Sequence, residues 1–185
     1  MQRGQVLVRL ALLAALAALG CSSGYWLLYL ALPGAAAVLI ARDGHDRYLG
    51  DDARRFLPVL RWLAGAYAYL WLLTDAPPTS EPGGPVELRV DLGGRPTTSS
   101  ALLRCITSLP ALFLLAVLSI AAVLFWVMGA IAILATERLP YAISDFISMK
   151  LRFQFRLVAY HLSLVDAYPA LTDSSLTTAT RSSGE

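Results

Sequence analysis

The residues best placed to do chemistry in this sequence are the arginines and aspartates that stand at the ends of two apolar stretches. Arg61 and Asp75 stand at the two ends of RWLAGAYAYLWLLTD, and Arg152 and Asp166 stand at the two ends of RFQFRLVAYHLSLVD. A charge inside a bilayer costs roughly 2.5–3.5 kcal/mol on insertion scales, so it should pair, face protein or reach the headgroups. The helix dipole also disfavours a carboxylate at a helix C-terminus. We therefore expect these four residues to have partners or to mark the membrane surface.

Two arrangements would satisfy these charges. If the two stretches lie antiparallel across a pseudo-twofold axis, Arg61 meets Asp166 and Arg152 meets Asp75. A pair within one stretch is excluded, because residues 61 and 75 of one helix are about 21 Å apart along its axis. In the alternative, each arginine reaches the headgroups and each aspartate ends a helix before a proline turn.

The other polar clusters favour no catalytic, metal or cofactor site. DGHDRYLGDD (43–52) groups His45 with aspartates, but its spacing matches no established metal loop, so we expect a solvated connector. The sequence contains no H-E-x-x-H, G-x-S-x-G, Walker or glycine-rich nucleotide motif. Its net charge of +2, without a basic run, argues against nucleic-acid binding. We expect a protein that is not an enzyme and uses no cofactor.

The elements that carry these charges are typical of a membrane protein. Apolar residues make up 57% of the chain and charged residues 15%, whereas a soluble domain has about 45–50% and about 25%. Residues 111–135 form a single apolar run of the length that spans a bilayer. Residues 149–165 instead place Arg152, Arg156 and Ser163 on one face of an amphipathic helix. The sequence thus predicts a multi-pass protein of the cell membrane, with the lipid bilayer and other membrane proteins or a second copy as partners.

The amino terminus imitates a bacterial lipoprotein signal. Arginines precede an apolar run, and Gly20-Cys21 is followed by serines, so Cys21 is a candidate lipidation site. A second apolar stretch (25–41) follows at once, however, where a mature lipoprotein has a polar tether. We therefore favour an uncleaved membrane helix.

The two charged stretches belong to a longer internal repeat. An offset of 91 takes Arg61, Tyr69, Asp75 and Pro78 to Arg152, Tyr160, Asp166 and Pro169, and an upstream offset of 95 takes Arg9 to Arg104. The repeat predicts a first membrane unit (1–78), a polar linker (79–103), a second membrane unit (104–170) and a disordered tail (171–185). Within the linker, the alternation in PVELRVDL (85–92) predicts a β-strand. The fold class expected is an all-α membrane protein of two tandem related helical units, with this strand-like segment between them.

The number of crossings stays open at this point. Arginines in the connectors, such as Arg42, Arg47 and Arg138, place both connectors in the cytoplasm by the positive-inside rule. Either every main helix crosses the bilayer, or residues 6–41 and 105–136 are hairpins and the motif helices are interfacial.

The motif residues resemble those of a bacterial membrane-protein family, Domain of Unknown Function 4389. Its members have a T-G-x-Y-P-like connector with Asp-Phe, and then an R-W…A-Y…L-L-T-D-x-Y-P-P helix. The first unit carries Arg61-Trp62, Ala68-Tyr69, Thr74-Asp75 and Pro77-Pro78, and the second carries Asp145-Phe146, Ala159-Tyr160, Asp166 and Tyr168-Pro169. The resemblance implies a bacterial, actinobacterial membrane protein with two tandem copies, and it implies no biochemical activity.

Three functions are compatible with this sequence. The first is a non-enzymatic membrane scaffold or accessory subunit. The second is a small transporter or channel component, which would need polar residues lining a path between the units. The third is a lipid-modifying or hydrolytic membrane enzyme, for which the sequence shows no paired acid and base. A lipoprotein anchored through Cys21 is a further alternative. Because the charges lie mostly at helix ends, the scaffold is the preferred interpretation.

Overall fold

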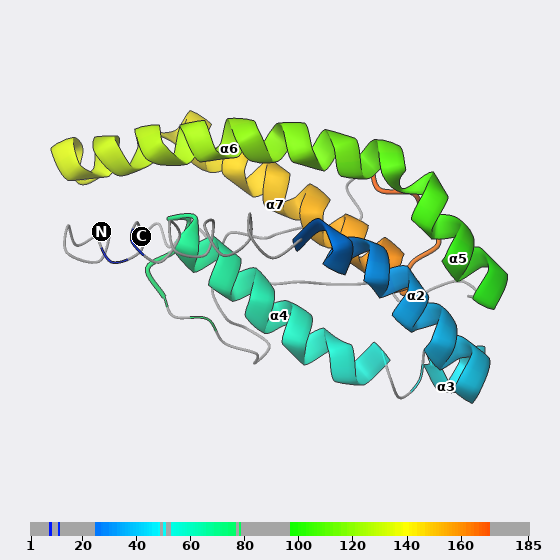
Figure 1. The fold of residues 1–185 in the computed structure, drawn as a ribbon. Coiled ribbons are helices and arrows are strands. Elements are labelled where there is room, and N and C mark those ends of the chain that lie inside the picture. The colour runs from blue at the N-terminus through cyan, green and yellow to red at the C-terminus, as the bar shows by residue number, and fades with distance from the viewer. Residues whose placement is uncertain are drawn as a thin grey trace.

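The computed structural model describes residues 8, 11, 25–48, 50, 53–76, 78 and 97–170, in which every regular element is a helix (Figure 1). The helices are α2 (Tyr25–Asp43), α3 (His45–Arg47), α4 (Ala53–Leu70), α5 (Thr98–Thr107), α6 (Leu109–Thr136) and α7 (Tyr141–His161). The expected all-helical class is confirmed for these residues. The strand predicted at 85–92 and the tail predicted at 171–185 lie outside them.

Helices α5 and α6 follow each other with a break of one residue. Thr97 begins α5 through a capping box, in which Ser100 N–H donates to Thr97 Oγ1 at 3.2 Å and Thr97 N–H donates to Ser100 Oγ at 3.0 Å. Ser108 ends α5 and starts α6, and Pro110 lies in the first turn of α6, where its missing N–H has no intrahelical partner to lose. Because α6 then runs unbroken over 28 residues, the alternative of a hairpin over 105–136 is wrong.

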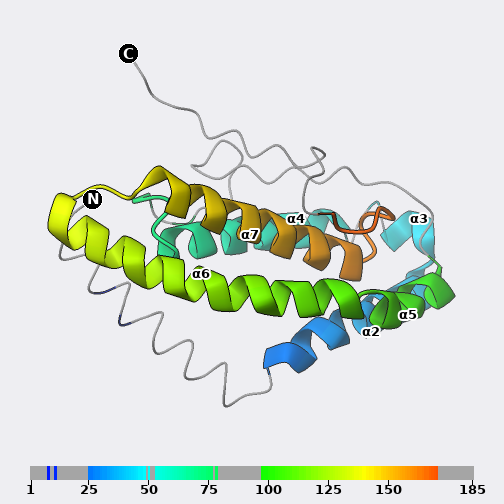
Figure 2. The same cartoon turned by 90° about the horizontal axis from the view of Figure 1, so that it is seen from above.

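A tight turn reverses the chain between α6 and α7, so that the two helices lie side by side and antiparallel (Figures 1 and 2). Glu137 adopts a left-handed φ of 59°, and its N–H donates to the carbonyl of Ile133. Helix α7 begins at Tyr141, earlier than the apolar pattern from 149 suggests. The reason is that Ile143 and Ile147 already pack on α6, which extends the buried helical stripe toward the turn.

Helix α7 is the central element of the bundle. Ile147 and Leu151 pack with Trp126 of α6 and with Trp71, just after α4, in one apolar cluster. Farther along, Phe153 and Leu157 of α7 pack with residues of α2 and α6 in a second cluster. Helix α2 also packs against α5 (Figure 2). The two halves of the described chain therefore share one core instead of forming separate ones.

The close approach of α6 and α7 depends on Gly129. A Cβ at this position would lie 2.9 Å from Leu139 Cδ1 and 3.2 Å from Ile143 Cγ2. Only a hydrogen atom fits there without displacing both side chains.

The outer side of α6 is unusually apolar. Phe113, Ile120 and Ile131 are 74%, 68% and 62% exposed. Within the described residues, α6 is the one helix that combines the length and hydropathy needed to cross a membrane. Helix α4, which contains most of the charged stretch that starts at Arg61, carries arginines at 54, 55 and 61 and lacks that combination.

Candidate functional site

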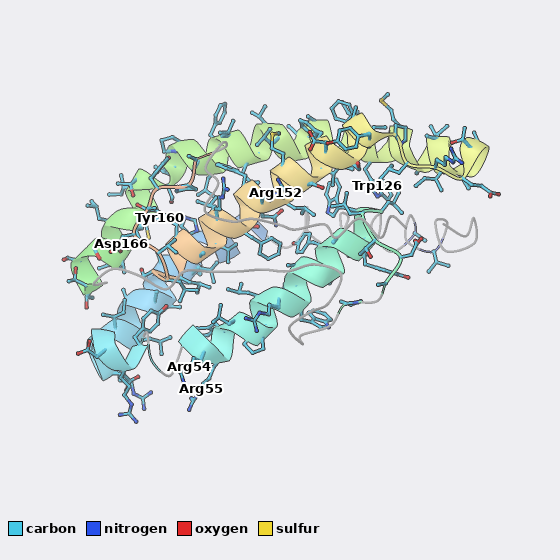
Figure 3. The ribbon with its side chains drawn as sticks, turned by 180° about the vertical axis from the view of Figure 1, so that it is seen from behind. Arg54, Arg55, Trp126, Arg152, Tyr160 and Asp166 are labelled. Atoms are coloured by element: carbon cyan, nitrogen blue, oxygen red, sulfur yellow. The ribbon has the colours of Figure 1, made fainter. Side chains whose placement is uncertain are left out.

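The motif residues Tyr160 and Asp166 meet at the C-terminal end of α7, where Arg104 of α5 binds both (Figure 3). One terminal nitrogen of Arg104 donates to the carbonyl of Tyr160 at 2.8 Å and to that of Val165 at 2.6 Å. The other forms an ion pair with Asp166 Oδ1 at 2.5 Å. The guanidinium carbon also lies 4.6 Å from the centre of the Tyr160 ring. A planar guanidinium can make all these contacts at once, whereas an ammonium cannot.

Arg104 explains how an aspartate is tolerated at this helix end. The last carbonyls of a helix lack intrahelical donors, and the dipole makes that end attractive to a cation. Arg104 is buried and supplies both the donors and the charge, while half-exposed Asp166 neutralises the arginine. The hydroxyl of Tyr48 donates to the carbonyl of Leu162, two residues after Tyr160. The site is therefore a brace that joins α5, α7 and the segment after α3.

Tyr160 and Tyr168 pack together beside the brace. The Tyr160 hydroxyl lies 3.0 Å from Thr107 Oγ1, and its ring meets that of Tyr168 edge to face at 5.8 Å between centres. Pro169 is buried. The second-unit motif thus folds back onto the end of its own helix.

The main chain at the end of α7 repeats the pattern found at the end of α4. In α7, Ser163 has a φ of 54°, Ser163 N–H donates to Tyr160 O, and Leu164 N–H donates to Ala159 O. In α4, Leu72 has a φ of 64°, Leu72 N–H donates to Tyr69 O, and Leu73 N–H donates to Ala68 O. Both ends are Schellman motifs, each with a non-glycine residue in the left-handed position. The two sets of positions differ by the offset of 91.

The first-unit motif residues lie apart from the Arg104 brace. Arg61 is half-buried on α4, Tyr69 and Pro78 are half-buried, and Asp75 is exposed. The predicted Arg61–Asp166 pair is wrong, because the ion pair that Asp166 makes in the described structure is with Arg104. Helix α5 leads directly into α6 and ends beside the end of α7, which places its arginine closer than one from α4. The Arg152–Asp75 pair stays a prediction, with Arg152 exposed on α7 (Figure 3).

A second polar group lies inside the bundle, on the buried side of α7. Lys150 Nζ donates to Gln154 Oε1 at 2.7 Å, and Gln154 Nε2 donates to the Tyr29 hydroxyl of α2 at 2.8 Å. Lys150 Nζ also lies 4.7 Å from the centre of the Trp71 ring. This chain of hydrogen bonds links α7 to α2.

His161 closes the polar side of α7 next to the brace. It is fully buried, and neither of its ring nitrogens has a hydrogen-bond partner. Burial, and then the nearby charge of Arg104, lower the pKa of His161 from 6.5 to about 4. The ring is therefore neutral at physiological pH and behaves as a packing group between Tyr29 and Tyr160.

Sequence reasoning missed the roles of Arg104, Lys150 and Gln154. Arg104 carried a signal, since the repeat aligns it with Arg9. Lys150 is the one lysine of the chain, but its position on the buried side of α7 is seen only when the neighbouring helices are in place. Cys21, the candidate lipidation site, lies outside the described residues.

The comparison with protein families agrees with the position of this site. Residues 98–171 match the family named Domain of unknown function (DUF4389). The match begins at the first residue of α5 and includes α6, α7 and every residue of the Arg104 brace except Tyr48. This part of the chain therefore carries the domain of that family. Neither a curated protein nor a solved structure matches the chain.

Proposed function

We propose that this chain is an integral membrane protein that serves as a non-enzymatic scaffold or accessory subunit. The observation that carries the proposal is the two-sided character of α6. One side packs Leu115, Ala122 and Ile133 into the core, and the other exposes large apolar side chains along its length. An exposed apolar surface of this kind is suited to acyl chains or to the apolar helix of another membrane protein. The apolar stretch at 6–41 is the sequence candidate for further crossings, which would make the protein multi-pass.

The proposal assigns the chain two tandem related units. Its support is the pair of Schellman motifs whose positions differ by the same offset as the sequence motif. Under this proposal Arg9, which lies outside the described residues, is the sequence counterpart of Arg104. A double-mutant cycle of Arg9→Ala and Asp75→Ala tests it, with an expected coupling of about 1 kcal/mol in the free energy of unfolding. Strictly additive effects would count against the duplication.

A non-enzymatic role is favoured by what the charged side chains do. Arg104 and Asp166 are used to brace a helix end, and His161 is held neutral without a hydrogen-bond partner. None of these groups faces another titratable group in the arrangement of a general acid and base. The partners proposed are the bilayer and other membrane proteins or a second copy of the chain.

Extraction and co-purification test this proposal. The tagged full chain should resist alkaline extraction from its native membranes and should co-purify with a partner, or with a second copy, at fixed stoichiometry after mild solubilisation. Release at alkaline pH would overturn the membrane assignment. A chain that stays in the membrane but purifies alone as a monomer would overturn the scaffold assignment.

A small transporter or channel component is the second candidate, and Lys150 is the observation that favours it. A buried cation at the junction of the two units is the kind of group that marks an ion or proton path. Flux through liposomes containing the full chain should then fall in Lys150→Met and persist in Lys150→Arg. Equal flux in the wild type and in protein-free liposomes would reject this candidate.

A further inference from the structure

Helix α4 presents to solvent a face that its own fold does not use. Arg54, Arg55, Pro58, Val59 and Trp62 are all exposed, and their spacing places them on one side of the helix. Leu60, Ala64 and Ala68 on the opposite side are buried. Figure 3 shows Arg54 and Arg55 at the outer end of α4, away from α6.

Local stability does not account for these exposed residues. Arginines in the first turn of a helix oppose its dipole, and α4 has no acidic residue in that turn. Val59 and Trp62 are 55% and 48% exposed, so about half of each side chain gains nothing from burial. The face thus combines charges and apolar surface that are both unfavourable for an isolated protein in water.

The order of residues along this face matches the profile of a membrane surface. Two guanidinium groups come first, Val59 follows, and an indole lies two turns, about 12 Å, beyond Arg54. Arginine binds phosphate oxygens through its fork of N–H groups, and tryptophan concentrates at the boundary between headgroups and acyl chains. The sequence from residue 53 to residue 74 contains three arginines and no acidic residue, so the helix itself is basic. Asp51 and Asp52, which precede it, lie outside the described residues.

We infer that the exposed face of α4 docks on the bilayer surface, with Arg54 and Arg55 on lipid phosphate groups and Trp62 at the top of the acyl chains. This inference rests on the proposed membrane function and adds to it a second lipid contact, distinct from α6. The two lipid contacts are held in a fixed relation to each other, because α4 and α6 both pack against the cluster of Trp71 and Trp126. Together they fix the depth of the bundle, because the arginines define the headgroup level.

Tryptophan fluorescence of the full chain in vesicles tests the inference. Vesicles contain phosphatidylcholine brominated either near the headgroup or near the chain end, and the contribution of Trp62 is the difference between wild type and Trp62→Phe. The expected result is strong quenching of this contribution by the shallow bromine and weaker quenching by the deep one. In Arg54→Gln/Arg55→Gln the shallow quenching should fall, whereas Arg138→Gln, an exposed arginine in the turn after α6, should leave it unchanged.

The outcomes separate this inference from the proposed function. If Trp62 is quenched by aqueous iodide and not by either brominated lipid, while the chain still resists alkaline extraction, the docking face is rejected and the membrane assignment stands. If the chain is released by alkali, both are rejected. Equal quenching by shallow and deep bromines would place Trp62 within the acyl chains and also overturn the interfacial assignment.

Discussion

The ends of α4 and α7 have the same main-chain hydrogen bonds but different braces. At the end of α4, the indole N–H of Trp126 from α6 donates to the carbonyl of Leu70 at 3.1 Å. At the end of α7, the buried guanidinium of Arg104 binds two carbonyls and an aspartate. A neutral donor thus serves one end and a charged one the other. The helix end is therefore encoded locally, whereas the group that binds it is set by the tertiary fold.

The largest difference between the two ends should be revealed by Arg104→Ala. It leaves Tyr160 and Val165 carbonyls without their donor and Asp166 without its counter-charge. We expect a loss of about 3 kcal/mol in the free energy of unfolding, at the low end for a buried ion pair because Asp166 is half-exposed. Denaturation in mixed micelles measures it, with Arg138→Ala as the control. Similar losses in the two variants would show that Arg104 is not a brace.

Leu72→Gly should weaken the end of α4 despite relieving its left-handed residue. Leu72 is 1% exposed and packs with Trp71 and Trp126. Losing that packing costs more than the relief of backbone strain, which is about 1 kcal/mol, so we expect a net loss of about 2 kcal/mol. The same denaturation measurement checks it. A gain in stability would mean that the strain at Leu72 outweighs its packing.

Acid should weaken the end of α7 and not that of α4, because His161 stands where α4 has Leu70. The pKa of His161 is lowered to about 4 in the folded chain, below its ordinary value of about 6.5. The unfolded chain therefore binds the extra proton between pH 6.5 and pH 4, and stability falls as the pH falls through that window. We expect a loss on the order of 1–2 kcal/mol in wild type that His161→Leu largely removes. Unfolding measured at pH 7 and pH 4.5 decides this.

Ser163→Gly should have the smallest effect and the opposite sign from Leu72→Gly. Ser163 is buried, has a φ of 54°, and its hydroxyl has no hydrogen-bond partner. Glycine relieves the strain and removes an unsatisfied polar atom, so we expect a gain of about 0.5–1 kcal/mol. A rise in the denaturation midpoint measures it. A loss would show that the Ser163 hydroxyl has a partner in solution.

The sequence predicted local features of this fold better than its partnerships. The apolar run of α6 could be predicted, because helix periodicity acts over a few positions. The two motif helices end at Leu70 and His161, however, five residues before the aspartates at which we expected them to end. The start of α7 was predicted too late, since Ile143 is identified as a core residue only when α6 is beside it. The Arg104–Asp166 pair spans 62 positions, and no local pattern distinguishes Arg104 from Arg61 as its donor. The inward orientation of Lys150 depends equally on the rotation of α7 about its axis.

Gly129 on α6 helps to set that rotation, because it has no side chain where Leu139 and Ile143 approach. Leu139 and Ile143 pack closely against this position on α6, where an added Cβ would lie 2.9 Å and 3.2 Å from their side chains. Because each residue turns an α-helix by about 100°, a slip of one position would turn Lys150 away from its partners inside the bundle and bring an outer residue into the core. The absence of a side chain at Gly129 therefore helps to determine which side chains of α7 face the core and which face outward.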